Sequence, residues 1–116
     1  MKIEITSQGA VVATGTLDDH ESARDFAALL PLELVLKDYA QTEKIADLPR
    51  AVSMRGAPMG CQPAAGDIAY YAPWGNLAIF HEDFEFSSGL VRLGRLDAGL
   101  DAMRRAGALA VRMAPA

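Results

Sequence analysis

The first residues of the chain alternate between hydrophobic and polar side chains. Ile3 and Ile5 are separated by single polar positions, which predicts a β-strand with one buried face. Gln8-Gly9 is a turn signal, and residues 10–16 are predicted to return as a second strand. The chain is therefore predicted to begin with a β-hairpin.

A helical period replaces this alternation in the next segment. Asp18 stands three residues before Glu21, a spacing typical of a capping box at the start of a helix. Apolar residues then recur on one helical face: Ala23, Phe26, Ala27 and Leu30. Pro31 lacks an amide hydrogen and disfavours helical geometry in the residue before it. A helix of about ten residues is therefore predicted to end at Leu30.

Further strand patterns follow, separated by one long irregular segment. Residues 49–66 are punctuated by three prolines and three glycines, and they are predicted to form a loop with room for one helical turn. A loop longer than about 12–15 residues in a compact domain is usually functional or mobile. Strands are predicted at residues 32–37, 43–48, 67–72, 77–81, 90–96 and 108–113.

A second short helix is predicted near the C-terminus. Asp97 is a suitable N-cap for residues 98–106, Arg104 and Arg105 suit the negative end of the helix dipole, and Gly107 suits the position after it. The sum is seven or eight short strands and two short helices. So little helix cannot cover an open sheet, so we predict a mainly β fold, a closed barrel capped by the two helices.

Length, composition and charge narrow the classes of function. The 116 residues are enough for one domain, predicted to span residues 1–116, and 51% of them are hydrophobic. The net charge of −4 gives no support to binding a phosphate backbone, so no nucleic-acid partner is expected. No apolar run approaches the roughly 20 residues that span a bilayer, so no membrane partner is expected. Cys61 is the single cysteine and the N-terminus lacks a signal-peptide pattern, so the expected location is the cytoplasm.

Residue patterns that carry catalysis or bind metals are scarce. Besides Cys61, the potential soft metal ligands are His20 and His81, at no spacing typical of a metal site. A metal at residues 81–83 is a weaker interpretation than a solvated cluster of charges. The chain has no glycine-rich phosphate motif and no recognisable nucleophile motif. No catalytic residue, metal or cofactor is therefore predicted.

Trp74 is the most distinctive aromatic residue, because it lies in the turn between two apolar segments. One interpretation, which we weight somewhat higher, is that its ring folds back and plugs the end of the barrel. The other is that Trp74, Tyr71 and Phe80 line a shallow ligand site, since aromatic residues dominate recognition surfaces.

Polar residues near the same strand ends are candidates for the border of that site. Tyr39 and Glu43 adjoin a strand end, and Arg50 is a candidate cation at the base of the long loop. The alternative for each is an ordinary surface position, with a surface salt bridge for Arg50. The predicted ligand-binding set is Tyr39, Glu43, Arg50, Tyr71, Trp74, Asn76 and Phe80.

Several segments resemble the cyclophilins. Residues 22–29, Ser-Ala-Arg-Asp-Phe-Ala-Ala-Leu, resemble the first cyclophilin helix, and residues 90–100 resemble a late cyclophilin segment. From about Lys2 to Ala110 the chain is more similar to a family of small stand-alone bacterial and archaeal cyclophilin-like domains. The motifs that carry this similarity are residues 38–39, 43–45, 48–49 and, most specifically, 66–77, Gly-Asp-Ile-Ala-Tyr-Tyr-Ala-Pro-Trp-Gly-Asn-Leu.

This resemblance implies an eight-stranded cyclophilin-type barrel with two capping helices. Cyclophilins that isomerise prolyl bonds use an arginine in a Phe-His-Arg strand motif, where the cation hydrogen-bonds around the proline amide. No Phe-His-Arg occurs here, and residues 32–36, the corresponding strand, contain no arginine. Arg50 and Arg55 are the candidates for a relocated cation.

Three hypotheses of function follow. The first is a binding module for a small molecule or a peptide segment, without standard prolyl isomerase activity. The second is a divergent peptidyl-prolyl cis-trans isomerase, motivated by the fold resemblance alone. The third is an interaction subunit or homo-oligomer that uses the same apolar face.

Overall fold

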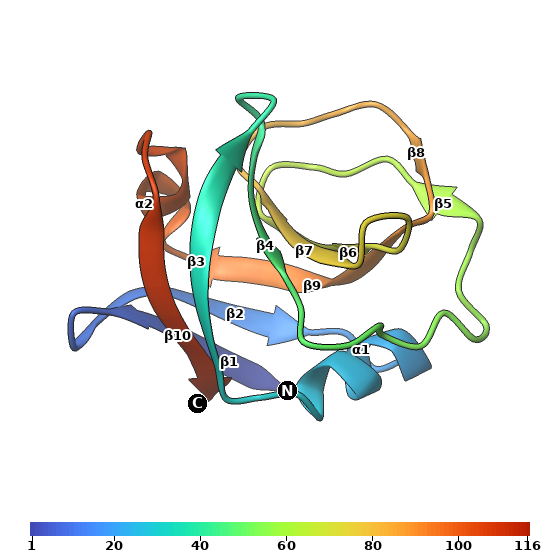
Figure 1. Ribbon diagram of the computed structural model, residues 1–116, viewed down its shortest axis with the longest axis horizontal. Helices are drawn as coiled ribbons and strands as arrows, with labels where there is room; N and C mark the ends of the chain where they lie inside the picture. The colour runs from blue at the N-terminus through green and yellow to red at the C-terminus, as the bar shows by residue number, and fades with distance from the viewer.

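Eight antiparallel strands pair in a closed ring in the computed structural model, which describes residues 1–116 (Figure 1). The order around the ring is β1-β10-β3-β4-β7-β6-β9-β2, so the strand edges are mutually satisfied. The predicted closed barrel is thus confirmed. Its strands are β1 (Lys2–Ser7), β2 (Ala10–Leu17), β3 (Leu32–Tyr39), β4 (Glu43–Asp47), β6 (Asp67–Tyr71), β7 (Asn76–Phe80), β9 (Leu90–Ala98) and β10 (Leu109–Pro115).

Two helices and a small ribbon complete the structure. Helix α1 (Glu21–Ala27) and helix α2 (Leu100–Arg104) lie at different ends of the barrel in Figure 1. Strands β5 (Gly60–Cys61) and β8 (Ser87–Ser88) pair beside the barrel. Strand β5 lies inside the segment predicted to be a loop, because a strand of two residues is too short to show an alternating pattern. No helix is long and apolar enough to cross a membrane.

The hydrophobic residues pack in two clusters on opposite faces of the barrel wall. The larger cluster fills the interior and includes Ile3, Leu36 and Leu77. The smaller consists of Ala69, Ala78, Phe80 and Leu90. Successive side chains of a strand point to opposite faces, so this smaller cluster lies on the outer face of β6, β7 and β9. Covering of both faces explains why β6 and β7 are almost continuously apolar.

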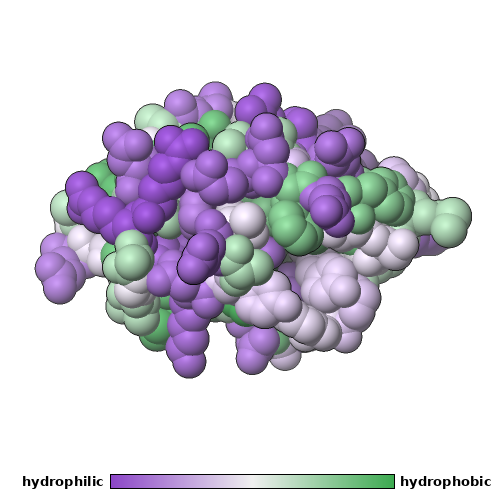
Figure 2. All heavy atoms as spheres, turned by 90° about the horizontal axis from the view of Figure 1, so that it is seen from above, coloured by the Kyte–Doolittle hydropathy of each residue, from purple (hydrophilic) through white to green (hydrophobic).

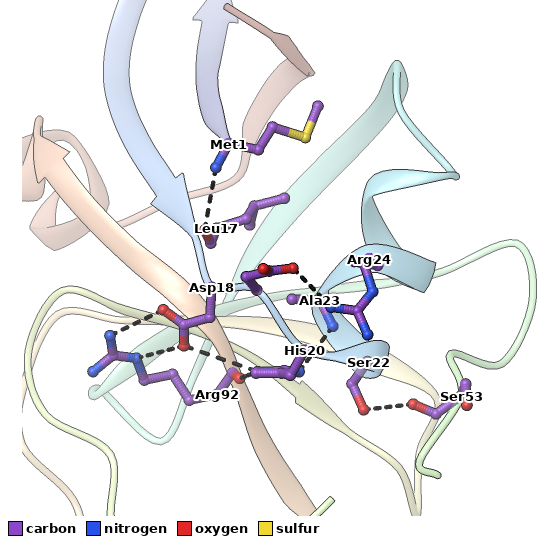
Figure 3. Close-up of polar contacts among 10 residues, drawn as sticks. Met1, Leu17, Asp18, His20, Ser22, Ala23, Arg24, Ser53 and Arg92 are labelled. Carbon is purple, nitrogen blue, oxygen red and sulfur yellow. Dashed lines mark hydrogen bonds and ion pairs between the residues drawn. The ribbon is translucent and has the colours of Figure 1, made fainter. Parts of the chain in front are cut away.

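Helix α1 begins at a different cap from the one predicted. His20 is the N-cap, and its Nδ1 atom accepts a hydrogen bond from the backbone amide of Ala23 at 3.2 Å (Figure 3). The Nε2 atom of the same ring lies 2.8 Å from the carbonyl oxygen of Arg92, so Nε2 is the atom that carries the proton. Asp18, the predicted cap, instead accepts two hydrogen bonds from the Arg92 guanidinium. The helix is also shorter than predicted: it ends at Ala27, and the predicted end was Leu30.

Helix α2 also begins later than predicted. Asp97 lies within β9, where its carboxylate accepts hydrogen bonds from Thr16 and Lys2. The N-cap is Gly99, whose φ of +95° favours glycine. A Cβ atom at Gly99 would lie 2.3 Å from the carbonyl oxygen of Val12, so only glycine fits. Pairing of β9 with β2 continues through Ala98, and this delays the start of the helix.

Candidate functional site

A cavity of about 230 Å³ opens on the outer face of the barrel. It lies over β3, β4, β6 and β7 and is closed on one side by the segment that leads through β8 to β9. The residues that line it are Tyr39, Ala40, Glu43, Ile45, Tyr71, Trp74, Asn76, Phe80, Phe84, Ser87 and Leu90. Six of the seven residues in the predicted ligand-binding set are therefore brought together, and Arg50 is not.

Strand register explains how residues far apart in sequence meet here. Glu43 lies directly opposite Tyr39 on β3 and Phe80 on β7. Tyr71 lies directly opposite Asn76 on β7 and Leu90 on β9. Residues directly opposite each other share one face of a sheet. Two cross-strand rows therefore bound the cavity, one centred on Glu43 and one on Tyr71.

Trp74 stands at the edge of the cavity and does not plug the barrel. Trp74 is 54% exposed. Its ring contacts those of Tyr39 and Tyr71 in edge-to-face geometry, at centroid distances of 5.2 and 5.3 Å. The interpretation weighted higher in the sequence analysis is thus wrong, because the turn holds the ring between two tyrosines. The turn itself contains Gly75 at a φ of +67°.

Exposed hydrophobic residues continue from the cavity toward the small ribbon. Tyr39, Trp74, Phe84, Phe86 and Met59 are all exposed. Figure 2 shows hydrophobic residues gathered toward the end of this face where Figure 1 places β5 and β8, with hydrophilic residues dominating the other end. An exposed apolar area of this kind, rimmed by polar residues, is typical of an interaction site.

Glu43 is the only acidic residue that lines the cavity, and it is only 8% exposed. Burial disfavours the charged form and raises the pKa of this carboxyl to about 7. The neighbouring Thr42 side chain acts in the opposite direction and lowers the pKa of Glu43, but burial is the larger effect. No lysine, arginine or histidine lines the cavity, so no cation balances the charge of Glu43.

Asn76 adds a second buried polar group. It is 2% exposed, and its side-chain carbonyl oxygen Oδ1 has no hydrogen-bond partner. A buried amide without a partner typically costs about 1–3 kcal/mol. The cavity therefore combines aromatic walls with a carboxyl that has no cation beside it and with a buried amide.

Arg50 lies on a different part of the molecule, where it holds the long segment against α1. Its guanidinium donates to both carboxylate oxygens of Asp25 at 2.9 and 3.0 Å, and the Ser53 amide donates to the same carboxylate. The hydrogen bond from Arg50 is the main reason that the pKa of Asp25 is lowered. No residue of 49–66 lines the cavity itself, but Cys61 pairs with Ser87 and packs against the cluster that contains Phe80 and Leu90, so this segment lies next to the site.

Five of the lining residues were not predicted from the sequence. They are Ala40, Ile45, Phe84, Ser87 and Leu90. Ile45 lies two residues after Glu43 on β4, so the period of a strand was a usable signal for it. Phe84 and Ser87 lie in a polar connection, where an isolated aromatic residue was the only indication.

The other candidate reactive groups give little support for catalysis or metal binding. Burial raises the pKa of the Cys61 thiol, which disfavours the nucleophilic thiolate. No group of three or more His, Cys, Asp or Glu side chains is arranged to hold a metal ion. Arg55, the other candidate for a relocated cation, lines a separate polar hollow of about 340 Å³ beside α1.

Comparison with known proteins gives a family and similar solved structures. The family model described as "Cyclophilin-like family" matches residues 5–114. The solution structure of a hypothetical protein from Archaeoglobus fulgidus is similar over 100% of this chain and 95% of that chain, with a TM-score of 0.71 and 21% sequence identity. At that identity the similarity shows the fold alone. No curated protein matches the chain.

Proposed function

The chain belongs to the cyclophilin-like family, and we propose that within it the protein is a binding module whose outer-face cavity holds a small organic molecule or one side chain of a peptide. The observation that carries the proposal is the pairing of aromatic walls with two buried polar groups: the Glu43 carboxyl, which has no cation beside it, and the Asn76 amide. Ligand sites are typically apolar hollows with a few polar groups that orient the ligand.

The size of the cavity limits what it can hold. Its volume of about 230 Å³ is below the roughly 300–1,000 Å³ of sites that enclose drug-sized ligands. A fragment with a few non-hydrogen atoms, or one side chain of a longer ligand, suits this space. The exposed rings of Trp74 and Phe84 at its edge would contact the remainder of a longer ligand.

Energetics also support a ligand-binding role. A domain is stable by only about 5–15 kcal/mol, so a buried carboxyl without a balancing cation is a considerable cost when it ionises. A ligand that hydrogen-bonds to this carboxyl recovers part of the cost on binding. A cavity kept only for packing would be filled with apolar side chains at no such cost.

The isomerase alternative has less support at this cavity. Cyclophilin-type isomerisation needs a cation next to the proline amide, and no arginine, lysine or histidine lines the hollow. Arg50 is engaged by Asp25, and Arg55 lies at the other hollow. We expect no acceleration of cis-trans exchange in an Ala-Pro peptide, measured by NMR exchange spectroscopy. Faster exchange that is lost in Arg55→Ala would favour the isomerase.

The proposal is tested by replacing a residue of the cavity wall with a large side chain that fills the cavity. Ser87 lines the cavity, whereas the adjacent Ser88 is exposed and points to the other face of the ribbon. The two variants Ser87→Trp and Ser88→Trp therefore add the same side chain to different faces. A library of fragments with about 5–12 non-hydrogen atoms is screened by saturation-transfer NMR against both variants and the unmodified protein.

We expect fragments that bind the unmodified protein and Ser88→Trp but not Ser87→Trp. Fragments of this size bind in the millimolar range, which the NMR method detects. If no fragment shows this difference while both variants keep the circular dichroism spectrum of the unmodified protein, the cavity is not a ligand site. Equal binding to both variants would place the site elsewhere on the molecule.

A further inference from the structure

We propose that the ligand of this cavity carries a protonated amine on a short apolar chain, with the ammonium group held by Glu43 inside the aromatic walls. This inference rests on the proposed function of the cavity and specifies the chemical class of its ligand. It follows from the hydrogen-bonding character of Glu43, from the charges around it and from the nature of the walls.

The carboxyl of Glu43 offers acceptors to a ligand. Glu43 lines the cavity, and its ionised form accepts hydrogen bonds only. The complementary ligand group therefore donates several hydrogen bonds. An ammonium group carries three N–H donors and no acceptor, and charge-assisted hydrogen bonds are roughly twice as strong as neutral ones.

The charges around the cavity favour a cation and disfavour an anion. The titratable groups that share the outer face with Glu43 near the cavity are Lys37 and Tyr39 on β3, Asp47 on β4 and Tyr71 on β6; Lys37 is exposed, lies opposite Ile45 and does not line the cavity. Lys44, the next residue on β4, points to the opposite face, where its ammonium group is bound to Asp38 and to the carbonyl oxygens of Arg105 and Gly107. An anionic ligand would face the Glu43 carboxylate with no cation to balance it.

The walls suit a cation attached to an apolar chain. Trp74 stands between Tyr39 and Tyr71 with its ring plane at 88° and 82° to theirs, so three aromatic rings meet at right angles along one side. Aromatic rings attract cations through their electron-rich faces, and tryptophan does so most strongly. Ile45, Phe80 and Leu90 supply aliphatic and aromatic surface for the carbon atoms of the ligand.

Proton linkage gives the proposal a second signature. Because the pKa of Glu43 is about 7, this carboxyl is about one-tenth ionised at pH 6 and about nine-tenths ionised at pH 8. A simple alkylammonium ion stays protonated over this interval, as the lysine side chain does. The affinity for an ammonium ligand should therefore rise about tenfold from pH 6 to pH 8, and the affinity for a neutral ligand should not rise.

The experiment compares n-butylammonium chloride with n-butanol, which has the same chain and a neutral end group. Dissociation constants are measured by NMR titration, with the Trp74 indole and the Asn76 side-chain amide as reporters. The proteins are the unmodified chain, Glu43→Gln, and Glu33→Gln as a control that removes one negative charge from an exposed position of β3. Titrations are made at pH 6 and pH 8.

We expect n-butylammonium to bind the unmodified protein at least tenfold more tightly than n-butanol at pH 8. Glu43→Gln should lose at least tenfold in affinity for n-butylammonium, lose its pH dependence and keep its affinity for n-butanol within about twofold. Glu33→Gln should behave as the unmodified protein, because its charge lies outside the cavity. Circular dichroism confirms that each variant is folded before it is titrated.

Distinct outcomes overturn the two proposals. If n-butanol binds as tightly as n-butylammonium and Ser87→Trp abolishes both, the cavity is a ligand site but the ammonium inference is wrong. The inference is also wrong if n-butylammonium does not bind while other fragments bind in the cavity. If no fragment distinguishes Ser87→Trp from Ser88→Trp, the proposed function itself fails.

Discussion

Replacement of Glu43 by glutamine should stabilise the ligand-free protein at neutral and alkaline pH. The pKa of Glu43 is about 7 in the folded chain, against 4.5 for an ordinary glutamate. Burial is the cause, so the folded state binds a proton that the unfolded state has already released between these two values. The contribution of Glu43 to stability is therefore greatest below about pH 4.5 and is lost as the pH rises through about 7. Glutamine has no proton to lose and avoids this fall.

The magnitude follows from the two pKa values. A difference of about 2.5 between them, at about 1.4 kcal/mol for each pKa unit, gives an upper limit of about 3.4 kcal/mol at pH 8. The carboxyl faces a hollow that opens to solvent, which screens part of this effect. We therefore expect Glu43→Gln to be about 2 kcal/mol more stable than the unmodified protein at pH 8 and equally stable near pH 4.

Urea denaturation followed by far-ultraviolet circular dichroism measures this difference at pH 4, 5, 6, 7 and 8. Other groups titrate in the same interval, but their contributions cancel when the variant is compared with the unmodified protein. Glu33→Gln provides the control, because an exposed glutamate should leave the pH profile unchanged. Parallel profiles for Glu43→Gln and the unmodified protein would refute the reasoning, since Glu43 would then have an ordinary pKa in the fold.

Three further predictions concern the parts of the structure that hold the site in place. Lys44→Met should destabilise the protein by about 3 kcal/mol in urea denaturation, because a fully buried ammonium group and its three hydrogen bonds are lost. The control Lys37→Met, at an exposed position of the neighbouring strand, should change stability by less than about 0.5 kcal/mol, and similar values for both variants would contradict the prediction. Arg50→Met should speed proteolysis within residues 48–59, because Arg50 holds this segment against α1. The variant should keep its affinity for n-butylammonium within about twofold, and a large loss of affinity would show that Arg50 contributes to the binding site. Gly94→Ala should lower the free energy of unfolding by about 2–3 kcal/mol, because its Cβ atom would lie 2.2 Å from a carbonyl oxygen of β2; an unchanged value would show that the two strands can separate locally.

The strands and their closure were largely readable from the sequence. Alternation around Ile3 and Ile5 identified the first hairpin, and the apolar runs on either side of Trp74 identified β6 and β7. These signals are local, because the period of two comes from the geometry of a single strand. The scarcity of helical pattern then pointed to a closed barrel.

Features that depend on contacts between distant segments were not readable. Asp97 has the residue type of an N-cap, but pairing of β9 with β2 keeps it in a strand, and Gly99 starts the helix instead. Arg50 lies close in sequence to the predicted site, yet Asp25 of α1 holds it elsewhere. In both cases a tertiary partner decides the outcome, and the local pattern carries no information about that partner.

The candidate site was partly predictable for the same reason. The aromatic residues Tyr71, Trp74 and Phe80 share one local motif, so they were found together. The lack of a balancing cation near Glu43 becomes visible only when the register places Tyr39 and Phe80 on either side of it. The sequence therefore indicated the location of the site, and the structure was needed for its chemistry.

The most direct test of this account is the pKa of Glu43, measured by ¹³C NMR titration of its side-chain carboxyl carbon without and with n-butylammonium. We predict a pKa of about 7 in the free protein, because the carboxyl is buried without a cation. A lower value is predicted in the complex, because a bound ammonium group favours the ionised form. A pKa near 4.5 that does not change when n-butylammonium is added would contradict the claim that Glu43 is a buried carboxyl that binds a cationic ligand.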